Sequence, residues 1–314
     1  KSLFVLSILS FSSFSLGCSA KETFHKLELT SASLGIWLWD ATNINRINIE
    51  DKIANLGINE VYVNTGWEPE ADEFYLKNHR LLYAMFAKEL DKRDIKVQGL
   101  LSNDDWAKNS EYNNFKKEVK YILDFNKNFK YNFDAVHLDI EPHKLKDWEG
   151  NEIKYLKSYI SNLKHIKKEI DIHNEKNKDD LRLVIDIPFW YANEEFCING
   201  ENVIDLLFDI VDEIILMTYT QNQKLFVECS LPALNIANKY KDKGIKIAME
   251  FQENEKDITL YNMRVDDLLD YVNKSLEEFK EYDSFKGLAI HKYKSYISYL
   301  DKELANYFGE VASQ

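Results

Sequence analysis

The sequence predicts a single (β/α)8 TIM barrel preceded by a cleaved signal peptide, and three observations support the barrel. Eight short strand-like runs alternate with amphipathic stretches of helical spacing. No long linker or low-complexity segment divides them, so we expect one domain over residues 27–310. A chain of 314 residues is long enough for one such barrel. An open doubly wound sheet is the alternative, but it normally carries a glycine-rich phosphate loop, which this sequence lacks.

Residues 1–20 differ in character from the rest of the chain. Apolar residues interleaved with serine follow Lys1, and the stretch ends in small residues up to Ala20. This pattern is typical of a secretory signal peptide and is short for a membrane span. Residues 15–18 resemble a bacterial lipobox, so we expect Cys18 to become the lipidated first residue of an exported cell-surface or periplasmic lipoprotein. Ordinary cleavage after Ala20 is the alternative.

The expected strands are short apolar runs, and each is followed by a helical pattern. Apolar residues recur every three or four positions over residues 153–170 and 265–279, as on one face of a helix. The strands are expected at residues 35–39, 60–64, 96–101, 135–141, 182–187, 213–219, 246–250 and 288–291.

The fourth expected strand has an unusual polar face. Apolar side chains at positions 136, 138 and 140 alternate with His137, Asp139 and Glu141, so the three ionisable groups share one face. On an edge strand this face would simply meet water. A closed barrel has no edges, so we expect these side chains to serve a site, because burying them otherwise costs several kcal/mol.

The carboxyl ends of the strands form the active-site end of such barrels. Each expected strand finishes on a group that can hydrogen-bond or ionise: Asp40, Asn64, Ser102 with Asn103, Glu141, Asp186, Tyr219, Glu250 and His291. From this end of the barrel we expect the following residues to bind substrate: His137, Asn64, Asp186, Trp190, Glu250 and His291.

The net charge of the chain limits which classes of partner we expect it to bind. The net charge of -13 disfavours nucleic acid and anionic membrane surfaces, which would be repelled. No glycine-rich phosphate motif is present, so nucleotide chemistry is not expected. A neutral carbohydrate fits this field better than a polyanion, and no cofactor is expected. The only contact with a membrane would be the lipid anchor at Cys18.

Two motifs resemble those of family-18 glycoside hydrolases, the chitinases and endo-N-acetylglucosaminidases. Residues 134–141, Asp-Ala-Val-His-Leu-Asp-Ile-Glu, are similar to the strand-four signature Asp-Gly-x-Asp-x-Asp-x-Glu. Residues 217–219, Met-Thr-Tyr, look like the strand-six Met-x-Tyr-Asp. The resemblance implies that Glu141 is the general acid. Asp139 and Tyr219 would hold the acetamido group of the substrate, which acts as the nucleophile.

Electrostatics agrees with these roles. Two residues along a strand are about 7 Å apart, and at an effective dielectric of about 20 two charges at that distance repel by roughly 2.4 kcal/mol. This corresponds to about two pKa units. We therefore expect Glu141 to keep its proton near neutral pH while Asp139 stays ionised.

The sequence departs from the family pattern at several positions. His137 replaces the middle Asp, Ala135 replaces the Gly, and Thr220 replaces the Asp after Tyr219. The small Ser-x-Gly-Gly turn of strand three is absent. His291 lies where the family has a strand-eight Trp.

Three other functions fit the same residues. A retaining glycosidase could use Glu141 as the acid and Glu250 as the nucleophile, if their carboxyls lie about 5 Å apart. A metal-dependent hydrolase could ligate its ion through His137, Asp139, Glu141, His291 and Glu250, although no close His pair is present. A non-catalytic lipoprotein could bind glycans without cleaving them.

Aromatic residues and cysteines add two expectations. Several tryptophans follow strand ends, where their rings could stack on sugars: Trp67, Trp106, Trp148 and Trp190. Trp37 and Trp39 are expected in the barrel itself. Beyond Cys18 the chain has Cys197 and Cys229, and the sequence leaves open whether they form a disulfide or remain two free thiols.

Overall fold

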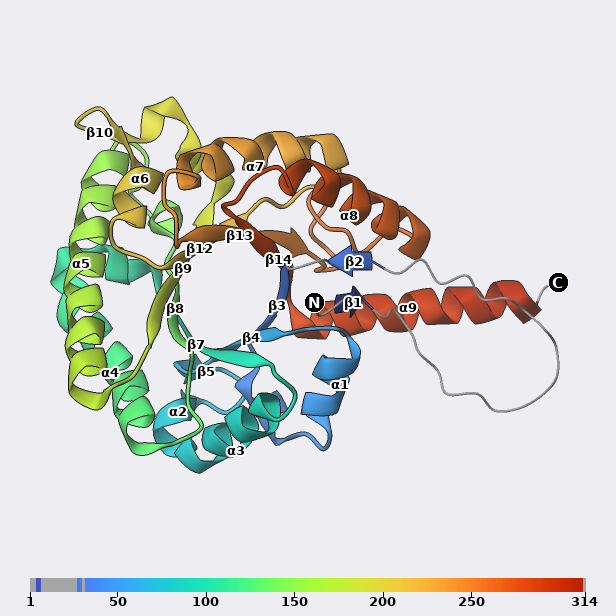
Figure 1. The fold of residues 1–314 in the computed structure, drawn as a ribbon, viewed down its shortest axis with the longest axis horizontal. Helices are drawn as coiled ribbons and strands as arrows, with labels where there is room; N and C mark the ends of the chain where they lie inside the picture. Colours follow the sequence, from blue (N-terminus) through green and yellow to red (C-terminus); the bar gives the residue numbers. More distant parts are fainter. Residues whose placement is uncertain (1–3, 7–26, 30–31, 313–314) are drawn as a thin grey trace.

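Eight parallel strands close into a barrel (Figure 1), in the order β12-β13-β14-β3-β4-β7-β8-β9. This computed structural model describes residues 4–6, 27–29 and 32–312. The predicted (β/α)8 barrel is confirmed, and the alternative of an open sheet is wrong. The barrel strands are β3 (Ser33–Leu38), β4 (Glu60–Asn64), β7 (Lys96–Ser102), β8 (Ala135–Asp139), β9 (Arg182–Pro188), β12 (Glu213–Met217), β13 (Gly244–Glu250) and β14 (Phe285–His291).

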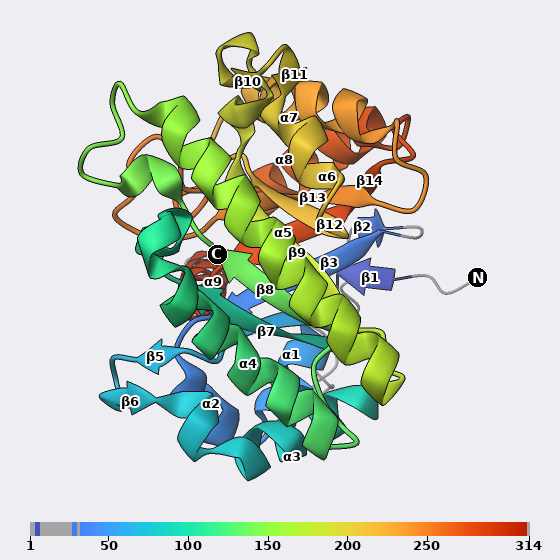
Figure 2. The same ribbon diagram turned by 90° about the vertical axis from the view of Figure 1, so that its left-hand side faces the viewer.

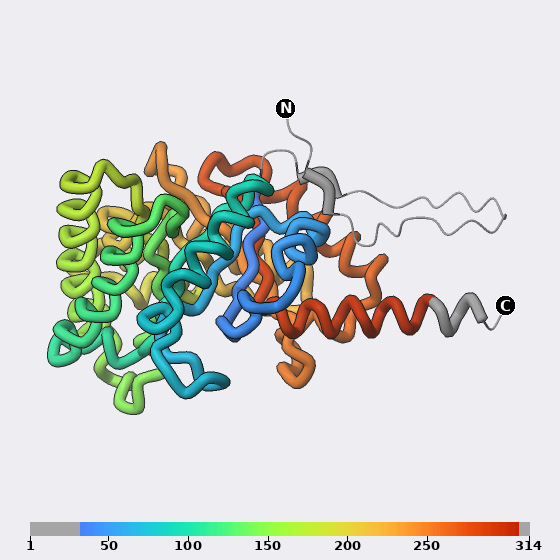
Figure 3. Tube along the Cα trace, turned by 90° about the horizontal axis from the view of Figure 1, so that it is seen from below, coloured from blue at the N-terminus to red at the C-terminus, as the bar shows by residue number. Residues whose placement is uncertain are grey.

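Helices surround the strands and cover their outer face (Figure 1). Figure 2 shows α4 and α5 lying over β7, β8 and β9, and Figure 3 shows α9 running outward past the other helices. The α-helices are α1 (Ile49–Asn55), α2 (Tyr75–Asn78), α3 (Arg80–Asp91), α4 (Tyr112–Asn128), α5 (Glu152–Asn177), α6 (Val203–Phe208), α7 (Gln223–Ala237), α8 (Val265–Phe279) and α9 (Tyr293–Ala312). No helix within the described residues has the length and apolar character needed to cross a membrane.

Short elements occupy the loops after the strands. The 3-10 turns are η1 (Ala41–Asn45), η2 (Asp104–Ala107), η3 (Asn109–Glu111), η4 (Pro142–Lys144), η5 (Phe189–Ala192) and η6 (Glu194–Phe196). The hairpins are β5 (Trp67–Glu68) with β6 (Glu73–Phe74), and β10 (Cys197–Ile198) with β11 (Glu201–Asn202). Cys197 and Cys229 are both free and half-buried.

Most of the expected signal peptide, including Cys18, lies outside the described residues. Within it the structure describes β1 (Phe4–Leu6), which pairs with β2 (Leu27–Leu29) in antiparallel fashion.

The strand with the polar face, β8, lies inside the sheet. It pairs with β7 on one side and with β9 on the other, so the interpretation of this segment as a solvent-facing edge strand is wrong. His137 is fully buried and Asp139 is half-buried. The strand ends at Asp139, two residues earlier than expected, and Glu141 directly precedes the η4 turn.

The barrel interior contains one cluster to which every strand contributes a residue. Two large aromatic rings dominate it, Trp37 and Tyr62, whose ring centroids lie 4.9 Å apart. Gly35 makes room for Tyr62, because a Cβ at that position would lie 1.9 Å from Tyr62 Oη. The cluster consists of Trp37, Tyr62, Leu100, Ala135, Val184, Ile215, Ala248 and Ala289, and Trp39 and Tyr219 pack against it.

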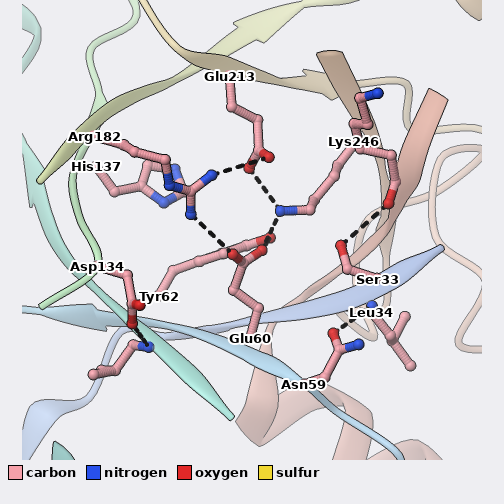
Figure 4. Close-up of polar contacts among 12 residues, drawn as sticks. Ser33, Leu34, Asn59, Glu60, Tyr62, Asp134, His137, Arg182, Glu213 and Lys246 are labelled. Atoms are coloured by element: carbon pink, nitrogen blue, oxygen red, sulfur yellow. Dashed lines mark hydrogen bonds and ion pairs between the residues drawn. The ribbon is translucent and has the colours of Figure 1, made fainter. Parts of the chain in front are cut away.

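A network of charged side chains, most of them buried, lies at the amino-terminal end of the strands (Figure 4). Lys246 bonds to Glu60 and also to Glu213 Oε1, the latter at 2.6 Å. Arg182 bridges the same two carboxylates at 3.4 Å each. We call these four residues the floor. Burial raises the pKa of Glu60, but the charges of Lys246 and Arg182 outweigh it and lower this pKa to about 2. The floor therefore holds the Glu60 carboxylate ionised.

Candidate active site

The carboxyl ends of the strands gather acidic and aromatic side chains into what we call the mouth of the barrel. Asp139, Glu141, Asp186 and Glu250 all act electrostatically on Tyr219, the residue expected to contact substrate from the sixth strand. Burial and these carboxylates together raise the pKa of Tyr219 well above its ordinary value, so its hydroxyl remains a hydrogen-bond donor. The sequence-predicted catalytic residues are thus brought together at one end of the barrel.

Asp186 and His137 form a fully buried pair beneath the mouth. His137 Nε2 lies 2.7 Å from Asp186 Oδ1, and the indole N–H of Trp37 donates to Asp186 Oδ2 at 3.2 Å. Burial lowers the pKa of His137 to about 3, so the imidazole is neutral. Its position out of reach of solvent argues against the expected contact with a sugar. His137 instead supports Asp186 from below.

Asp139 stands above this pair with an unused oxygen. Its Oδ1 is buried and has no hydrogen-bond partner within the described residues. Burial, reinforced by the charges of Asp186 and Glu141, raises the pKa of Asp139 well above its ordinary value. The expectation that Asp139 stays ionised is therefore wrong for the unliganded protein. An orphaned, protonated carboxyl at the mouth can accept or donate one more hydrogen bond.

Glu141 is held by two basic side chains from its own turn. His143 Nε2 lies 3.1 Å from Glu141 Oε2, and Lys144 bonds to Oε1. Burial raises the pKa of Glu141, but these hydrogen bonds outweigh it and hold the pKa below the ordinary value. The expectation that charge repulsion keeps Glu141 protonated is therefore wrong. The repulsion exists, but it raises the pKa of Asp139 instead.

Glu250 and His291 form a second hydrogen-bonded group at the mouth. His291 Nδ1 lies 2.7 Å from Glu250 Oε2, and the Trp39 indole N–H donates to His291 Nε2 at 3.0 Å. The other oxygen of Glu250 accepts the backbone N–H of Gln252 at 2.6 Å. Tyr219 stacks obliquely on His291, with ring centroids 5.9 Å apart. Both expected residues are at the mouth, and each oxygen of Glu250 already takes part in one hydrogen bond.

Asn64 has a local role that differs from the expected one. Its side-chain amide donates to the backbone oxygen of Trp67 at 3.0 Å and to Glu68 at 3.3 Å, and its oxygen accepts from Gly66 N at 3.0 Å. These bonds satisfy the amide and leave it buried. Asn64 therefore shapes the loop after β4 and is not placed to bind a sugar.

The tryptophans fall into four settings. Trp106 is buried and stacks on Phe115 at 5.0 Å, so it belongs to the core and not to a sugar platform. Trp67 is 48% exposed on the β5–β6 hairpin. Trp148 and Trp190 are half-buried and enclose His143, with ring centroids 6.5 and 5.1 Å from its imidazole. Trp37 and Trp39 pack on the barrel interior, as expected.

Metal ligation has no matching geometry in the part of the chain that the structure describes. No group of three or more His, Cys, Asp or Glu side chains there is arranged to hold an ion. The side chains proposed for this role are instead divided between hydrogen-bonded groups, with His137 on Asp186 and His291 on Glu250.

Sequence reasoning missed three residues of this site. Asp104 Oδ1 accepts the backbone N–H of Glu141 at 3.0 Å, and His143 and Lys144 bind its carboxylate. The sequence did contain a pattern from which His143 and Lys144 could have been predicted. In Glu-Pro-His-Lys the proline favours a tight turn, and such a turn brings its first and fourth residues together.

The fold and its acidic mouth place the protein among the (β/α)8 barrels whose strand ends carry a carboxylate-rich site. Neither protein-family models nor curated proteins give a match to the sequence. Solved structures do match the fold. A GH18 chitinase from Pseudoalteromonas aurantia has a TM-score of 0.57 at 13% identity, over 88% of this chain and 99% of its own.

Two further structural neighbours have the same fold. A GH18 N-acetylglucosaminidase from Paenibacillus barengoltzii has a TM-score of 0.55 at 13% identity, over 84% of this chain and 96% of its own. A spore cortex-lytic enzyme from Bacillus megaterium has a TM-score of 0.51 at 11% identity, over 83% and 70%. The resemblance to family-18 glycoside hydrolases is therefore confirmed in the fold.

Proposed function

We propose that this protein hydrolyses a glycosidic bond of an N-acetylated sugar, with Glu141 as the proton donor. The observation that carries the proposal is the grouping of Asp139, Glu141 and Tyr219 at the mouth, with Asp139 Oδ1 left without a partner among the described residues. The fold shared with GH18 chitinases and an N-acetylglucosaminidase supports the same choice of substrate.

The chemistry follows from the protons that these groups carry. Glu141 would give a proton to the glycosidic oxygen, while the acetamido oxygen of the substrate attacks the anomeric carbon and the leaving sugar departs. The Tyr219 hydroxyl would donate to the acetamido oxygen, and Asp139 would accept from the acetamido N–H. A water molecule then opens the cyclic intermediate and returns a proton to Glu141. Before the first step, the proton that Asp139 carries must move to Glu141.

Replacing Glu141 by Gln tests this proposal. On chromogenic N-acetylglucosamine oligosaccharides, kcat should fall at least about 10²-fold, since general acid catalysis contributes about 10²–10⁴-fold. The circular dichroism spectrum and melting temperature should stay close to those of the parent protein. Turnover at the parent rate in the Glu141→Gln protein would refute the assignment.

Glycan binding without cleavage is the second candidate, and one observation favours it. The pKa of Glu141 lies below its ordinary value because His143 and Lys144 hold its carboxylate, which opposes proton donation. Calorimetric titration with the same oligosaccharides separates the two functions. Binding by both the parent and the Glu141→Gln protein, with no turnover by either, would establish the binding function.

We also propose that the protein is exported and anchored in a membrane through a lipid on Cys18. The support comes from the composition of residues 1–20 and the lipobox-like residues 15–18. Metabolic labelling with a fatty-acid analogue tests this. A mature protein that begins at Lys21 and carries no label would rule out the anchor.

A further inference from the structure

We propose that Lys144 is a positioning residue that keeps Glu141 ionised in the unliganded protein, and that Lys144 must leave Glu141 before Glu141 can donate a proton. The catalytic half of this inference rests on the proposed function. The first half concerns the unliganded protein and can be tested without any substrate.

The local sequence forces this contact. Glu141 precedes the η4 turn with Pro142 at its start, and the backbone N–H of Lys144 donates to the backbone oxygen of Glu141 at 2.9 Å. This turn brings the side chains of the third and fourth residues back onto the carboxylate. His143 takes one carboxylate oxygen and Lys144 takes the other. In the unliganded state, neither oxygen of Glu141 is free to carry a proton toward a substrate.

The two basic side chains differ in their freedom to move. The side chain of His143 is 21% exposed, and it is enclosed by Trp148, Trp190 and Tyr191. The side chain of Lys144 is 56% exposed. An exposed lysine on a flexible stem gains little free energy from an ion pair and can leave it easily. Lys144 is therefore the removable member, and His143 remains as a fixed hydrogen-bond partner.

The other groups that face Glu141 either oppose its ionisation or are neutral. The ionisation of Glu141 therefore depends strongly on Lys144. Three carboxyl groups lie around the Glu141 carboxylate: Asp139 on β8, Asp186 on β9 and Asp104 in η2. Each is either negative or protonated, so none of them favours the ionised form of Glu141. The Tyr191 and Tyr219 hydroxyls also face it, and burial raises the pKa of both phenols. Among the described interactions of Glu141, the only basic partners are His143 and Lys144. Removing Lys144 should therefore raise the pKa of Glu141.

The test compares Lys144→Met with Lys144→Arg and with Lys146→Met. Lys144→Met removes the charge and keeps the stem, whereas Lys144→Arg keeps the charge. Lys146 is exposed on the same loop, and no described contact joins it to Glu141, so Lys146→Met is the matched control. The Glu141 carboxyl is titrated by ¹³C NMR in the unliganded proteins, with its resonance assigned through Glu141→Gln. The pH profile of kcat/KM is measured in parallel, because it reports the ionisation of the free enzyme.

We expect the Glu141 titration in Lys144→Met to move to higher pH by about half to one pH unit, while Lys144→Arg and Lys146→Met stay near the parent protein. The basic limb of kcat/KM should move in the same direction, which gives about three- to tenfold more activity above that limb. An unchanged NMR titration in Lys144→Met would overturn the inference. If the titration moves as expected but no variant cleaves any sugar, Lys144 keeps its role and the proposed hydrolysis is refuted.

Discussion

The imidazole of His291 donates a hydrogen bond from Nδ1 to Oε2 of Glu250 across 2.7 Å. The direction of this bond is fixed by Trp39, whose indole can only donate and therefore makes His291 Nε2 the acceptor. The backbone N–H of Gln252 donates to the other oxygen of Glu250 and so fixes its carboxylate. Glu250 in turn orients the His291 ring at the mouth. This arrangement favours a positioning role for Glu250 over that of a free nucleophile.

Glu250→Gln should therefore lower kcat by about tenfold or less, since the change weakens the orientation of His291 but removes no covalent step. A nucleophile at this position would instead lose several orders of magnitude. Initial rates on an N-acetylated chromogenic substrate decide between the two. A glycosyl ester trapped on Glu250 by a fluorinated substrate, and seen by mass spectrometry, would establish the two-glutamate mechanism in place of the one proposed.

Removal of metal ions should leave activity unchanged, because the candidate ligands are divided between the His137–Asp186 and His291–Glu250 pairs. The measurement is the rate before and after dialysis against a chelator, with the dialysed protein also assayed after adding Zn²⁺ or Mn²⁺. Loss of activity that either ion restores would show a metal-dependent hydrolase.

Lys246→Met should destabilise the protein by about 3–5 kcal/mol, the usual cost of leaving buried charges without their partner. Both Glu60 and Glu213 would lose their bond to the ammonium group, and Arg182 alone would have to balance them. Urea unfolding measures the loss. Adding Glu60→Gln to Lys246→Met should restore part of it.

Lys274→Met serves as the matched control for this experiment, because it removes an exposed ion pair with Asp270 on α8. That change should alter the free energy of unfolding by less than about 1 kcal/mol. If the two lysine variants lost the same free energy of unfolding, the predicted contribution of the floor to stability would be wrong.

His137 should make the barrel sensitive to mild acid. The pKa of His137 is lowered to about 3 from 6.5, so the folded state keeps the ring neutral at a pH where the unfolded chain is protonated. As the pH falls from about 6.5 toward 3, the unfolded state therefore binds the proton first and stability is lost.

Replacing His137 by Gln removes this proton uptake. Between pH 7 and 4 the variant should lose less stability than the parent protein, by up to about 3 kcal/mol, although it starts from a lower value. Urea unfolding at several pH values measures the difference. His165→Gln is the control, because His165 is an exposed histidine on α5. A parent-like pH dependence in His137→Gln would contradict the prediction.

The fold could be predicted because the apolar runs of the strands and the helical spacing of the stretches between them are local properties. The positions of Asp139, Glu141 and Tyr219 at one end of the barrel followed from the same pattern. The floor could not be predicted in this way, since a single charged residue near the start of a strand also suits a solvent-exposed turn. Only closure of the barrel brings Lys246 to Glu60, 186 residues away in the chain.

Ionisation at the mouth was predicted incorrectly for a related reason. Spacing along a strand gives the repulsion between Asp139 and Glu141, but not which of the two carboxyls bears its effect. That choice depends on the η4 turn, which places His143 and Lys144 on Glu141, and on the burial of Asp139.

The floor also determines how the chain can be divided. A fragment that ends after α5 would keep Glu60 and none of the other three residues of the floor. The complementary fragment would hold Arg182, Glu213 and Lys246, with one positive charge in excess. Neither half-barrel balances the charges of its own part of the floor, so we expect each fragment to be more stable with the other present than alone. Circular permutation, in contrast, keeps all four residues in one chain and should preserve the closed barrel.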